Sequence, residues 1–395
     1  MSNKSFISLG VSQDVVSILD KKGYEFATPI QEELIPKFFN SSQDLIAQAD
    51  TGTGKTGAFG IPLIDSMNLQ EKFIHAIVLA PTRELANQVA TELDFYKGKK
   101  PIDIIQVCGG QSMKLQIDQL KRIKKASIIV GTPGRVIDHM NKKRLKLKDI
   151  NYLVIDEVDE MLNFGFKEDI DLIVNQTNPN RRTVILSATL PKHVMRTAEN
   201  YLTDPLVLKR TDATKKPKIN QIYYKVNRIS KIKLLCRVID EMDDFYGFIF
   251  CNTKREVDQI AEQLIQLGYN VESMHGDLSQ AQRDRALAKF KVRQCDILVV
   301  TDVAARGIDI KNISHVINLS VPQNTEVYTH RIGRTGRAGQ SGTSITFVRE
   351  SEFHKFKRVL RQQNNAIKKL EIPDAKAVIR KKKKAIVKQI STSEV

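Results

Sequence analysis

Residues 45–56 read Leu-Ile-Ala-Gln-Ala-Asp-Thr-Gly-Thr-Gly-Lys-Thr, and this stretch decides the fold. Its apolar start predicts a strand, and Gly52–Thr56 predicts a turn that opens a helix. Glycines let the backbone approach a phosphate, and the amides at a helix N-terminus point at the anion. We expect Lys55 to reach the β- and γ-phosphates and the Thr56 hydroxyl to bind Mg²⁺. The strict pattern has glycine where this chain has Ala49, so the motif is not decisive alone.

An arginine cluster lies about 280 positions downstream, where residues 330–337 read His-Arg-Ile-Gly-Arg-Thr-Gly-Arg. That separation is too large for one domain of typical size. A phosphate loop in one domain and arginines in another predict an ATP site assembled between two domains. Arginines that neutralise charge on the γ-phosphate contribute about 10³–10⁵-fold in related systems. A site that opens and closes favours a motor or a clamp over a simple kinase; a basic loop facing RNA is the alternative interpretation of this cluster.

Short apolar runs alternate with helical stretches along the first half of the chain. The apolar runs are Leu45–Ala47, Ile74–Ala80, Ile128–Val130, Tyr152–Ile155 and Val184–Leu186, and the helical stretches include Glu84–Tyr96 and Lys114–Lys124. Strand, loop and helix in repetition predict an α/β fold with a doubly wound parallel sheet. Ligands of such sheets bind beyond the carboxyl ends of the strands, and each motif of chemical interest follows an apolar run.

A polar break separates this series from a second one. The second series has its apolar runs at Ile222–Val226, Phe248–Cys251, Ile297–Val300, Val316–Leu319 and Ser344–Val348. The break, Lys209–Lys218, is charged and contains Pro217, which is typical of an interdomain linker. We therefore expect a first domain at 1–208, a linker at 209–218, a second domain at 219–372 and a basic tail at 373–395. The halves resemble each other in pattern only, without a convincing sequence repeat.

The composition is strongly basic. The 395 residues carry a net charge of +17 with a pI of about 9.5, which favours a polyanionic partner such as nucleic acid. The four cysteines form no C-x-x-C pair, as is typical of reduced cytosolic proteins. No apolar run approaches the ~18 residues of a membrane-spanning helix. We expect a cytoplasmic protein without a membrane span, and a monomer because no heptad pattern stands out.

The tail does not explain the basic charge alone. Residues 367–395 hold nine Lys or Arg and three Asp or Glu, a net +6, so the other 366 residues still carry +11. A solvated tail, an auxiliary electrostatic contact with RNA and a helix on a membrane surface all fit this composition.

An acidic run follows another predicted strand. Residues 156–159 read Asp-Glu-Val-Asp directly after Tyr152–Ile155. A carboxylate at a strand end, opposite a phosphate loop, can hold Mg²⁺, and a neighbouring Glu can polarise the attacking water. We therefore expect Asp156, together with Thr56, to be the metal residue and Glu157 to be the catalytic base.

Taken in order, these motifs resemble those of the DEAD-box ATP-dependent RNA helicases of superfamily 2. The resemblance covers residues 6–350. It implies two tandem RecA-like domains joined by a flexible linker, ATP and Mg²⁺ as cofactors, and RNA as a largely sequence-independent partner. Near the N-terminus, Phe6, Gly23-Tyr24 and the run Thr28–Gln31 are similar to the family's adenine-recognising Q motif. By this resemblance Gln31 reads the adenine edge and Tyr24 stacks on its face, and a Gln amide can pair with adenine through two hydrogen bonds.

The resemblance carries four sets of residues over to this chain. The nucleotide set is Tyr24, Thr28, Gln31, Thr51, Gly52, Thr53, Gly54, Lys55, Thr56, Gly307 and Asp309. The catalytic set is Lys55, Asp156, Glu157, Arg334 and Arg337. The set that couples hydrolysis to RNA binding is Asp159, Ser187, Thr189, His330 and Arg331. The set that grips the RNA sugar-phosphate backbone is Pro81, Thr82, Arg83, Gly109, Gly110, Thr132, Pro133, Gly134, Arg135, Gln280, Arg283 and Thr301. Hydroxyls, arginines and glycines suit contacts that hold phosphates without reading bases.

One departure from the family pattern is Val158, which stands where the family's name has alanine. Neither Mg²⁺ binding nor water activation uses this side chain, so we expect hydrolysis to survive, whereas β-branching affects local packing. The expected function is an RNA-stimulated ATPase that locally unwinds short RNA duplexes, with possible ribonucleoprotein partners. The alternatives are an ATP-gated RNA clamp or scaffold with little unwinding, and a DNA helicase of the same superfamily.

Overall fold

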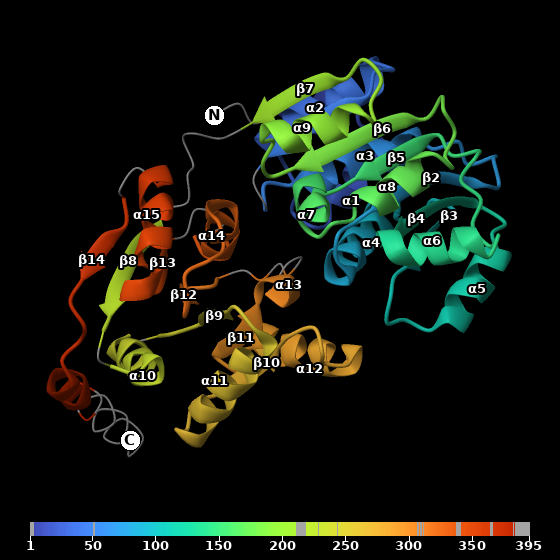
Figure 1. The fold of residues 1–395 in the computed structure, drawn as a ribbon. Helices are drawn as coiled ribbons and strands as arrows, with labels where there is room; N and C mark the ends of the chain where they lie inside the picture. The colour runs from blue at the N-terminus through green and yellow to red at the C-terminus, as the bar shows by residue number, and fades with distance from the viewer. Residues whose placement is uncertain are drawn as a thin grey trace, which may run out of the picture. The chain divides into compact units, whose positions relative to one another are not determined.

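The chain forms two compact units, residues 1–214 and 215–395 (Figure 1). The structure, a computed structural model, describes residues 4–49, 52–210, 219–227, 229–242, 244–305, 308, 310, 312–336, 341–363, 366–381 and 383. Four of the predicted site residues, Thr51, Gly307, Asp309 and Arg337, lie outside these ranges, as does most of the predicted linker.

The first unit is built on a seven-stranded parallel sheet in the order β3-β4-β2-β5-β6-β1-β7. Its strands are β1 (Leu45–Ala49), β2 (Ile74–Leu79), β3 (Ile102–Val107), β4 (Ala126–Gly131), β5 (Tyr152–Ile155), β6 (Arg182–Ser187) and β7 (Leu206–Arg210). The central strands are almost wholly buried because helices cover both faces, which explains their continuous apolar runs.

Two apolar clusters fill the two faces of this sheet. Leu45 and Ala47 pack into one cluster and Ile46 into the other, as the twofold alternation of a strand requires. One face is covered by α1 (Gln13–Asp20), α2 (Pro29–Asn40), α3 (Lys55–Ser66) and α4 (Arg83–Lys97). The other is covered by α5 (Met113–Lys121), α6 (Pro133–Asn141), α7 (Val158–Asn163), α8 (Lys167–Val174) and α9 (Lys192–Glu199).

The second unit has a seven-stranded parallel sheet in the order β10-β11-β9-β12-β13-β8-β14. Its strands are β8 (Ile219–Val226), β9 (Gly247–Cys251), β10 (Val271–Met274), β11 (Ile297–Thr301), β12 (His315–Asn318), β13 (Gly342–Arg349) and β14 (Lys368–Leu370). Its helices are α10 (Lys231–Glu241), α11 (Lys254–Gln266), α12 (Gln280–Lys291), α13 (Asp302–Ala305), α14 (Thr325–Ile332) and α15 (Phe353–Gln362).

The helices of the second unit also divide between the two faces of the sheet. Leu234 of α10 and Val257 of α11 pack into one apolar cluster. Phe290 of α12, Tyr328 of α14 and Phe356 of α15 pack into clusters on the other face. The predicted doubly wound fold is therefore confirmed in both halves of the chain.

Two stretches differ from the sequence prediction. Lys209 and Arg210, which we assigned to the linker, are the last residues of β7 and pair with Gln48 and Ala49 of β1. The polar composition is tolerated there because β7 is an edge strand with one unpaired side. The tail begins as a helix at residues 375–381; Val378 of this helix is buried, and Nζ of Lys381 donates a hydrogen bond to the carbonyl of Glu241 at the end of α10.

Candidate active site

The candidate residues of the first unit gather at one edge of the sheet, because all seven strands are parallel and each motif follows a strand end. The neighbouring strands β3, β4 and β2 are followed by Gly109–Gly110, Thr132–Arg135 and Pro81–Arg83. The neighbouring strands β5, β6 and β1 are followed by Asp156–Asp159, Ser187–Thr189 and Gly52–Thr56. The predicted RNA-binding residues thus occupy one half of the edge and the predicted nucleotide residues the other half.

The phosphate loop leads from β1 into α3. Gly54, the N-cap of α3, has φ = 90°, a left-handed conformation that favours glycine. Lys55 begins the helix, and only 7% of it is exposed. Its Nζ has no hydrogen-bond partner among the described residues. A buried ammonium without a partner is costly, so this nitrogen is placed to receive an anion.

Asp156 and Glu157 follow β5 and are both buried. Burial raises the pKa of Asp156 to about 7; Lys55 opposes this shift and Glu157 adds to it. Oδ1 of Asp156 also has no hydrogen-bond partner in the described part of the chain. Glu157 has φ = 54°, an unusual conformation for a residue with a side chain, and such strain concentrates at functional sites.

Gln31 connects the N-terminal motif to the phosphate loop. Its Oε1 accepts a hydrogen bond from the backbone N–H of Thr28 at 2.9 Å, and its Nε2 donates to the carbonyl of Gly54 at 3.1 Å. A Cβ at Gly54 or Gly57 would come within 2.7 or 2.6 Å of that Nε2, so both glycines make room for the amide. The predicted stacking residue, Tyr24, is exposed.

The predicted coupling residues of the first unit are in direct contact. Oδ2 of Asp159 accepts hydrogen bonds from the backbone N–H of Thr189 at 2.9 Å and from its hydroxyl at 2.8 Å. The Ser187 hydroxyl donates to the carbonyl of Thr189. These hydrogen bonds connect the acidic motif to the loop after β6. Val158 lies between Glu157 and Asp159 and is fully buried in the apolar core.

We call the half of the edge that carries the predicted RNA-binding residues the RNA half. It consists of helix N-termini and glycines. Thr82 caps α4 by accepting a hydrogen bond from the backbone N–H of Leu85 at 3.2 Å. Thr132 is the N-cap residue of α6, and Pro133 is its first residue. Gly110 has φ = 73°. Exposed amides at helix N-termini and close-approach glycines suit a phosphate backbone.

Gln116 is a residue of this half that the sequence analysis missed. It lies on α5, and only 1% of it is exposed. Its Nε2 donates to the carbonyl of Cys108 at 2.8 Å, and its Oε1 lies 3.2 Å from Nη1 of Arg135 and 3.0 Å from Nε2 of His139. One amide thus joins the strand end before Gly109 to the arginine of the loop after β4. A lone Gln in a helical pattern carries no sequence signal for this role.

The second unit places its predicted RNA residues in the same way. Thr301 ends β11, and Gln280 begins α12 after the neighbouring strand β10, with Arg283 one turn further. Thr253 follows β9 and caps α11 by accepting a hydrogen bond from the backbone N–H of Glu256 at 3.1 Å. Three adjacent strand ends again carry these groups.

Arg331, on α14, and Arg334, just beyond it, differ in their surroundings. Only 1% of Arg331 is exposed, and its Nε and Nη2 contact the two carboxylate oxygens of Asp302 at 2.5 and 2.7 Å. It also donates to Asn318 and Asn252 and lies over the ring of Phe250. Arg331 is thus held within its own unit.

Arg334 lies just beyond α14 and donates from Nη1 to the carbonyl of Ile308 at 3.0 Å, in the predicted nucleotide-facing segment. His330 is partly buried on α14, one residue before Arg331.

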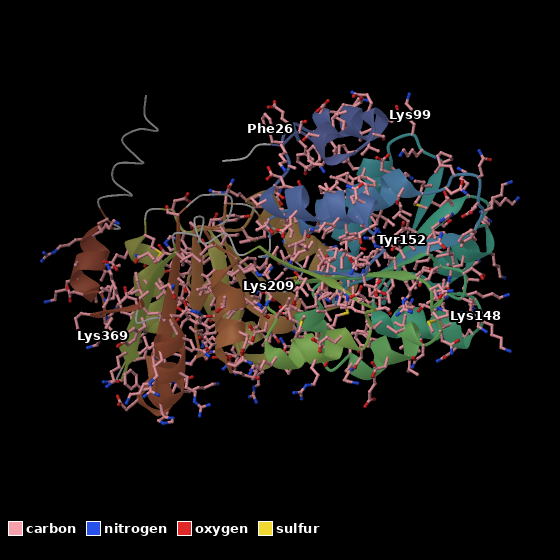
Figure 2. All side chains as sticks on the ribbon, turned by 90° about the horizontal axis from the view of Figure 1, so that it is seen from above. Phe26, Lys99, Lys148, Tyr152, Lys209 and Lys369 are labelled. Atoms are coloured by element: carbon pink, nitrogen blue, oxygen red, sulfur yellow. The ribbon has the colours of Figure 1, made fainter. Side chains whose placement is uncertain are left out.

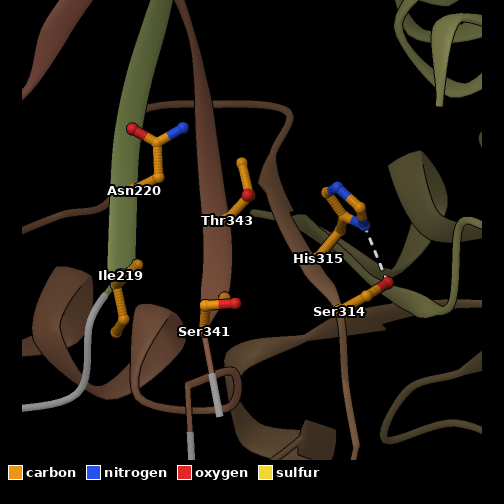
Figure 3. A pocket seen from close by; sticks show the side chains of 7 residues that line it. Ile219, Asn220, Ser314, His315, Ser341 and Thr343 are labelled. Carbon is orange, nitrogen blue, oxygen red and sulfur yellow. Dashed lines mark hydrogen bonds between the residues drawn. The ribbon is translucent and has the colours of Figure 1, made fainter.

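A hollow of about 570 Å³ in the second unit is lined by residues at the starts of strands (Figure 3). Ile219 and Asn220 begin β8, and His315 begins β12, where its Nδ1 lies 2.7 Å from the Ser314 hydroxyl. This hollow is at the opposite edge of the sheet from the motifs and contains none of the predicted site residues.

These features define a class. A parallel α/β sheet carries a glycine loop and a strand-end carboxylate here, together with a buried lysine whose Nζ has no hydrogen-bond partner in the described part of the chain. This combination is typical of a P-loop nucleoside triphosphatase.

Comparison with known proteins gives the family. The model described as DEAD/DEAH box helicase matches residues 28–197, and the model described as helicase conserved C-terminal domain matches residues 230–339. The chain belongs to the DEAD-box family of ATP-dependent RNA helicases.

The relatives cover nearly the whole chain. The DEAD-box ATP-dependent RNA helicase CshA of Geobacillus kaustophilus is 42% identical over 370 residues, 93% of this chain and 79% of the relative. The crystal structure of a DEAD box protein from Methanococcus jannaschii is 42% identical and covers 93% of this chain and 99% of that one, with a TM-score of 0.54. Dbp5 of S. cerevisiae bound to RNA and ADP BeF3 is 29% identical and covers 96% and 100%, with a TM-score of 0.86. These relatives confirm the two RecA-like domains and do not favour the clamp alternative.

In the part of the chain that the structure describes, no helix is both long and apolar enough to cross a membrane.

Proposed function

We propose that this chain hydrolyses ATP when RNA is bound and uses the cycle to separate short RNA duplexes. The observation that carries the proposal is a pair of buried polar atoms, Lys55 Nζ and Asp156 Oδ1. Neither has a hydrogen-bond partner among the described residues, and both lie at the sheet edge that carries the predicted phosphate-binding loops. Phosphate chemistry and RNA binding then occur on neighbouring strands of one rigid sheet.

Mg²⁺ fits the residues of this site. Mg²⁺ is commonly bound by one or two carboxylates together with substrate phosphates and water, so it does not require a dedicated cage of side chains. The described residues contain no cluster of three or more His, Cys, Asp and Glu side chains, whereas Asp156 and Thr56 lie beside the phosphate loop. When bound with ATP, the ion neutralises charge on the phosphates.

Each residue of the first unit then has a task. Lys55 and the amides of the phosphate loop hold the phosphates, and Gln31 fixes the loop through Gly54 while it offers its amide to the adenine edge. Glu157 orients and polarises the attacking water. The buried side chain of Val158 points into the core, so it leaves this chemistry unchanged.

RNA binding is coupled to hydrolysis through contacts within each unit. The bonds from Thr189 to Asp159 tie the loop after β6 to the catalytic carboxylates. ATP and RNA favour a closed state in which Arg334, together with Arg337, neutralises charge on the γ-phosphate, as a population shift between open and closed states. Closure bends one RNA strand away from its partner, and phosphate release reopens the protein.

Steady-state ATPase assays without nucleic acid, with structureless RNA and with DNA of matched length test the proposal. Strong stimulation by RNA alone is expected, followed by multiple-turnover strand separation of a short RNA duplex. Equal stimulation by DNA, or none by either polymer, would refute it. A long-lived RNA complex with slow phosphate release and no unwinding would show a clamp instead.

A further inference from the structure

Helix α15 has one buried side and one exposed side. Phe356 and Val359 are buried in an apolar cluster, and the ring of Phe356 lies 5.1 Å from that of Tyr223 on β8. The helix runs beside β13 at the surface of the second unit (Figure 1). Packing fixes the rotation of the helix, and with it the direction of the opposite side chains.

The exposed side of α15 carries only basic charge. His354, Lys357, Arg358 and Arg361 are all exposed, and their spacing of i, i+3, i+4 and i+7 places them in one stripe. We call these four residues the basic stripe. The helix contains four Lys or Arg and no Asp or Glu.

No carboxylate among the described residues pairs with the basic stripe. On α8, by contrast, the exposed Lys167 has such a partner: its Nζ lies 2.7 Å from Oδ2 of Asp171. Like charges three and four residues apart destabilise a helix, and Lys357 and Arg361 are such a pair. The helix dipole favours a cation in the last turn, which accounts for Arg361 and not for Lys357. Lys357 Nζ lies 5.6 Å from the ring centre of Phe353, and no carboxylate among the described residues neutralises the charges of the stripe.

The basic stripe lies on the same face of the sheet as the predicted RNA contacts of α12. The register aligns Phe248 of β9 with Val316 of β12, and Val316 with Ser344 of β13. Phe248 packs against α12. Val348 lies four residues after Ser344 and therefore on the same face of β13, and it packs against α15. The strands beneath α15 are β13 and β8, which lie three and four positions from β11 in the sheet. At the usual spacing of neighbouring strands, this is a distance of about 14–19 Å. An RNA strand that is bound at the sheet edge with the motifs and continues across this face would meet the basic stripe.

We propose that the basic stripe of α15 is a second docking surface for the phosphate backbone of RNA, outside the helicase motifs. This inference rests on the proposed function, because it concerns RNA that continues beyond the contacts of Thr301, Gln280 and Arg283. The stripe binds without base preference, since Lys and Arg on one helix face contact phosphates and not base edges. Its effect is to retain long RNA between cycles of ATP hydrolysis.

The test compares two triple variants of the full chain, each of which removes three positive charges. One is Lys357→Gln, Arg358→Gln, Arg361→Gln. The matched control is Lys72→Gln, Lys99→Gln, Lys148→Gln, three exposed lysines of the first unit that precede β2, β3 and β5, at the edge opposite the motifs; Figure 2 labels two of them. Binding of fluorescein-labelled oligouridines of increasing length is measured without nucleotide over a range of salt concentrations.

The stripe variant should bind long oligouridines about tenfold more weakly at low salt. The slope of log affinity against log salt should fall by about 2, since each lost contact with a single strand removes about 0.7. Binding of the shortest oligouridines that stimulate the ATPase should not change, and the control variant should behave as wild type. The charge-preserving variant Lys357→Arg, Arg358→Lys, Arg361→Lys should retain wild-type affinity.

Several results would overturn the proposal. An unchanged slope would show that the stripe does not contact RNA and would fit an acidic protein partner instead. An equal loss in the control would indicate a nonspecific effect of net charge, and an equal loss for the shortest RNA would indicate damage to the motifs. Failure of the proposed function gives a different result: no RNA stimulation of the wild-type ATPase, whatever the binding slopes.

Discussion

Counted from the first strand of each unit, both sheets run in the order 3-4-2-5-6-1-7, so the two halves of the chain have one topology. Their sequences differ enough that only the alternation pattern is alike. What distinguishes the units is the chemistry of the loops at equivalent strand ends. The shared topology therefore sets the positions of the loops, and the residues of each loop determine the chemistry of its unit.

The loops after strands 2, 3 and 4 are alike in the two units. Thr82 and Thr253 follow strand 2, and both cap the next helix with their hydroxyls. Gly110 and Gly276 follow strand 3, whereas Thr132 and Thr301 stand at the end of strand 4. Two units with matching groups on matching strands suit a repeating phosphate backbone, which offers the same contacts at each step.

The loops after strands 1 and 5 differ. Strand 1 of the first unit leads into Gly52–Thr56, whereas strand 1 of the second leads into α10, which is capped by Ser230. Strand 5 of the first unit is followed by carboxylates, and strand 5 of the second by Arg331 on α14 and by Arg334 just beyond it. In the proposed function, the loops of the first unit hold the phosphates and activate water, and Arg334 of the second unit supplies positive charge.

The largest expected effect follows from removing that positive charge. Arg334→Ala should lower the RNA-stimulated turnover number by about 10³-fold or more, because such arginines stabilise the transition state directly. The measurement is steady-state ATPase activity at saturating ATP and RNA. Arg334→Lys tests whether charge alone suffices, and it should recover only part of the loss because it lacks the planar guanidinium. A loss below threefold for the alanine variant would remove Arg334 from the catalytic set.

The variant Glu157→Gln tests the carboxylates that follow strand 5 of the first unit. This change keeps the shape of the side chain and removes the base, so turnover should fall by about 10²–10⁴-fold. ATP-dependent RNA binding should remain, because the residues that hold the phosphates and the RNA are intact. Radiolabelled phosphate release and RNA binding with ATP are measured on the same preparation. Undiminished hydrolysis would exclude Glu157 as the base.

A third prediction separates the structural role of Arg331, on α14, from the predicted catalytic role of Arg334, just beyond that helix. Arg331→Gln leaves Asp302, whose side chain is 23% exposed, without its cation. Breaking a fully buried pair costs about 3–5 kcal/mol, and the partial exposure of Asp302 lowers this cost. The second unit should therefore unfold at lower denaturant concentration, as measured by hydrogen exchange resolved along the chain, whereas the first unit should not change. If the amides of the second unit were as well protected from exchange in the variant as in wild type, the structural role of Arg331 would be contradicted.

The sequence predicted the central strands of both sheets and missed the same strands in each. Five strands per sheet were located, and the four not located are β3, β7, β10 and β14, which are the edge strands. An edge strand has one unpaired side and is less covered by helices, so it lacks the apolar run that marks a buried strand. Lys368 and Lys369 of β14, both exposed, are the clearest example, and Figure 2 labels the second.

The candidate site was predictable where motifs are contiguous in sequence. Gly52–Thr56 and Asp156–Asp159 follow strands, and the parallel topology brings them to one edge. Contacts between distant segments could not be predicted, because they depend on how loops pack in three dimensions. The hydrogen bond from Gln31 to Gly54 and the burial of Arg331 against Asp302 are of this kind.

The smallest expected effect concerns Gln116, whose contacts with Arg135 and the carbonyl of Cys108 could not be predicted from the sequence. Gln116→Ala leaves the carbonyl of Cys108 and the side chains of Arg135 and His139 without this partner, and each unsatisfied buried group costs about 1–3 kcal/mol. The RNA concentration for half-maximal ATPase activity should rise about tenfold, while turnover at saturating RNA should change little, since Gln116 contacts no catalytic residue.

Gln116→Glu is the matched variant: its carboxylate still accepts from Arg135 but cannot donate to Cys108. An RNA affinity between those of wild type and Gln116→Ala would show that both ends of the amide position the RNA loops. A fall in turnover with unchanged RNA affinity would instead place Gln116 in the nucleotide half of the edge.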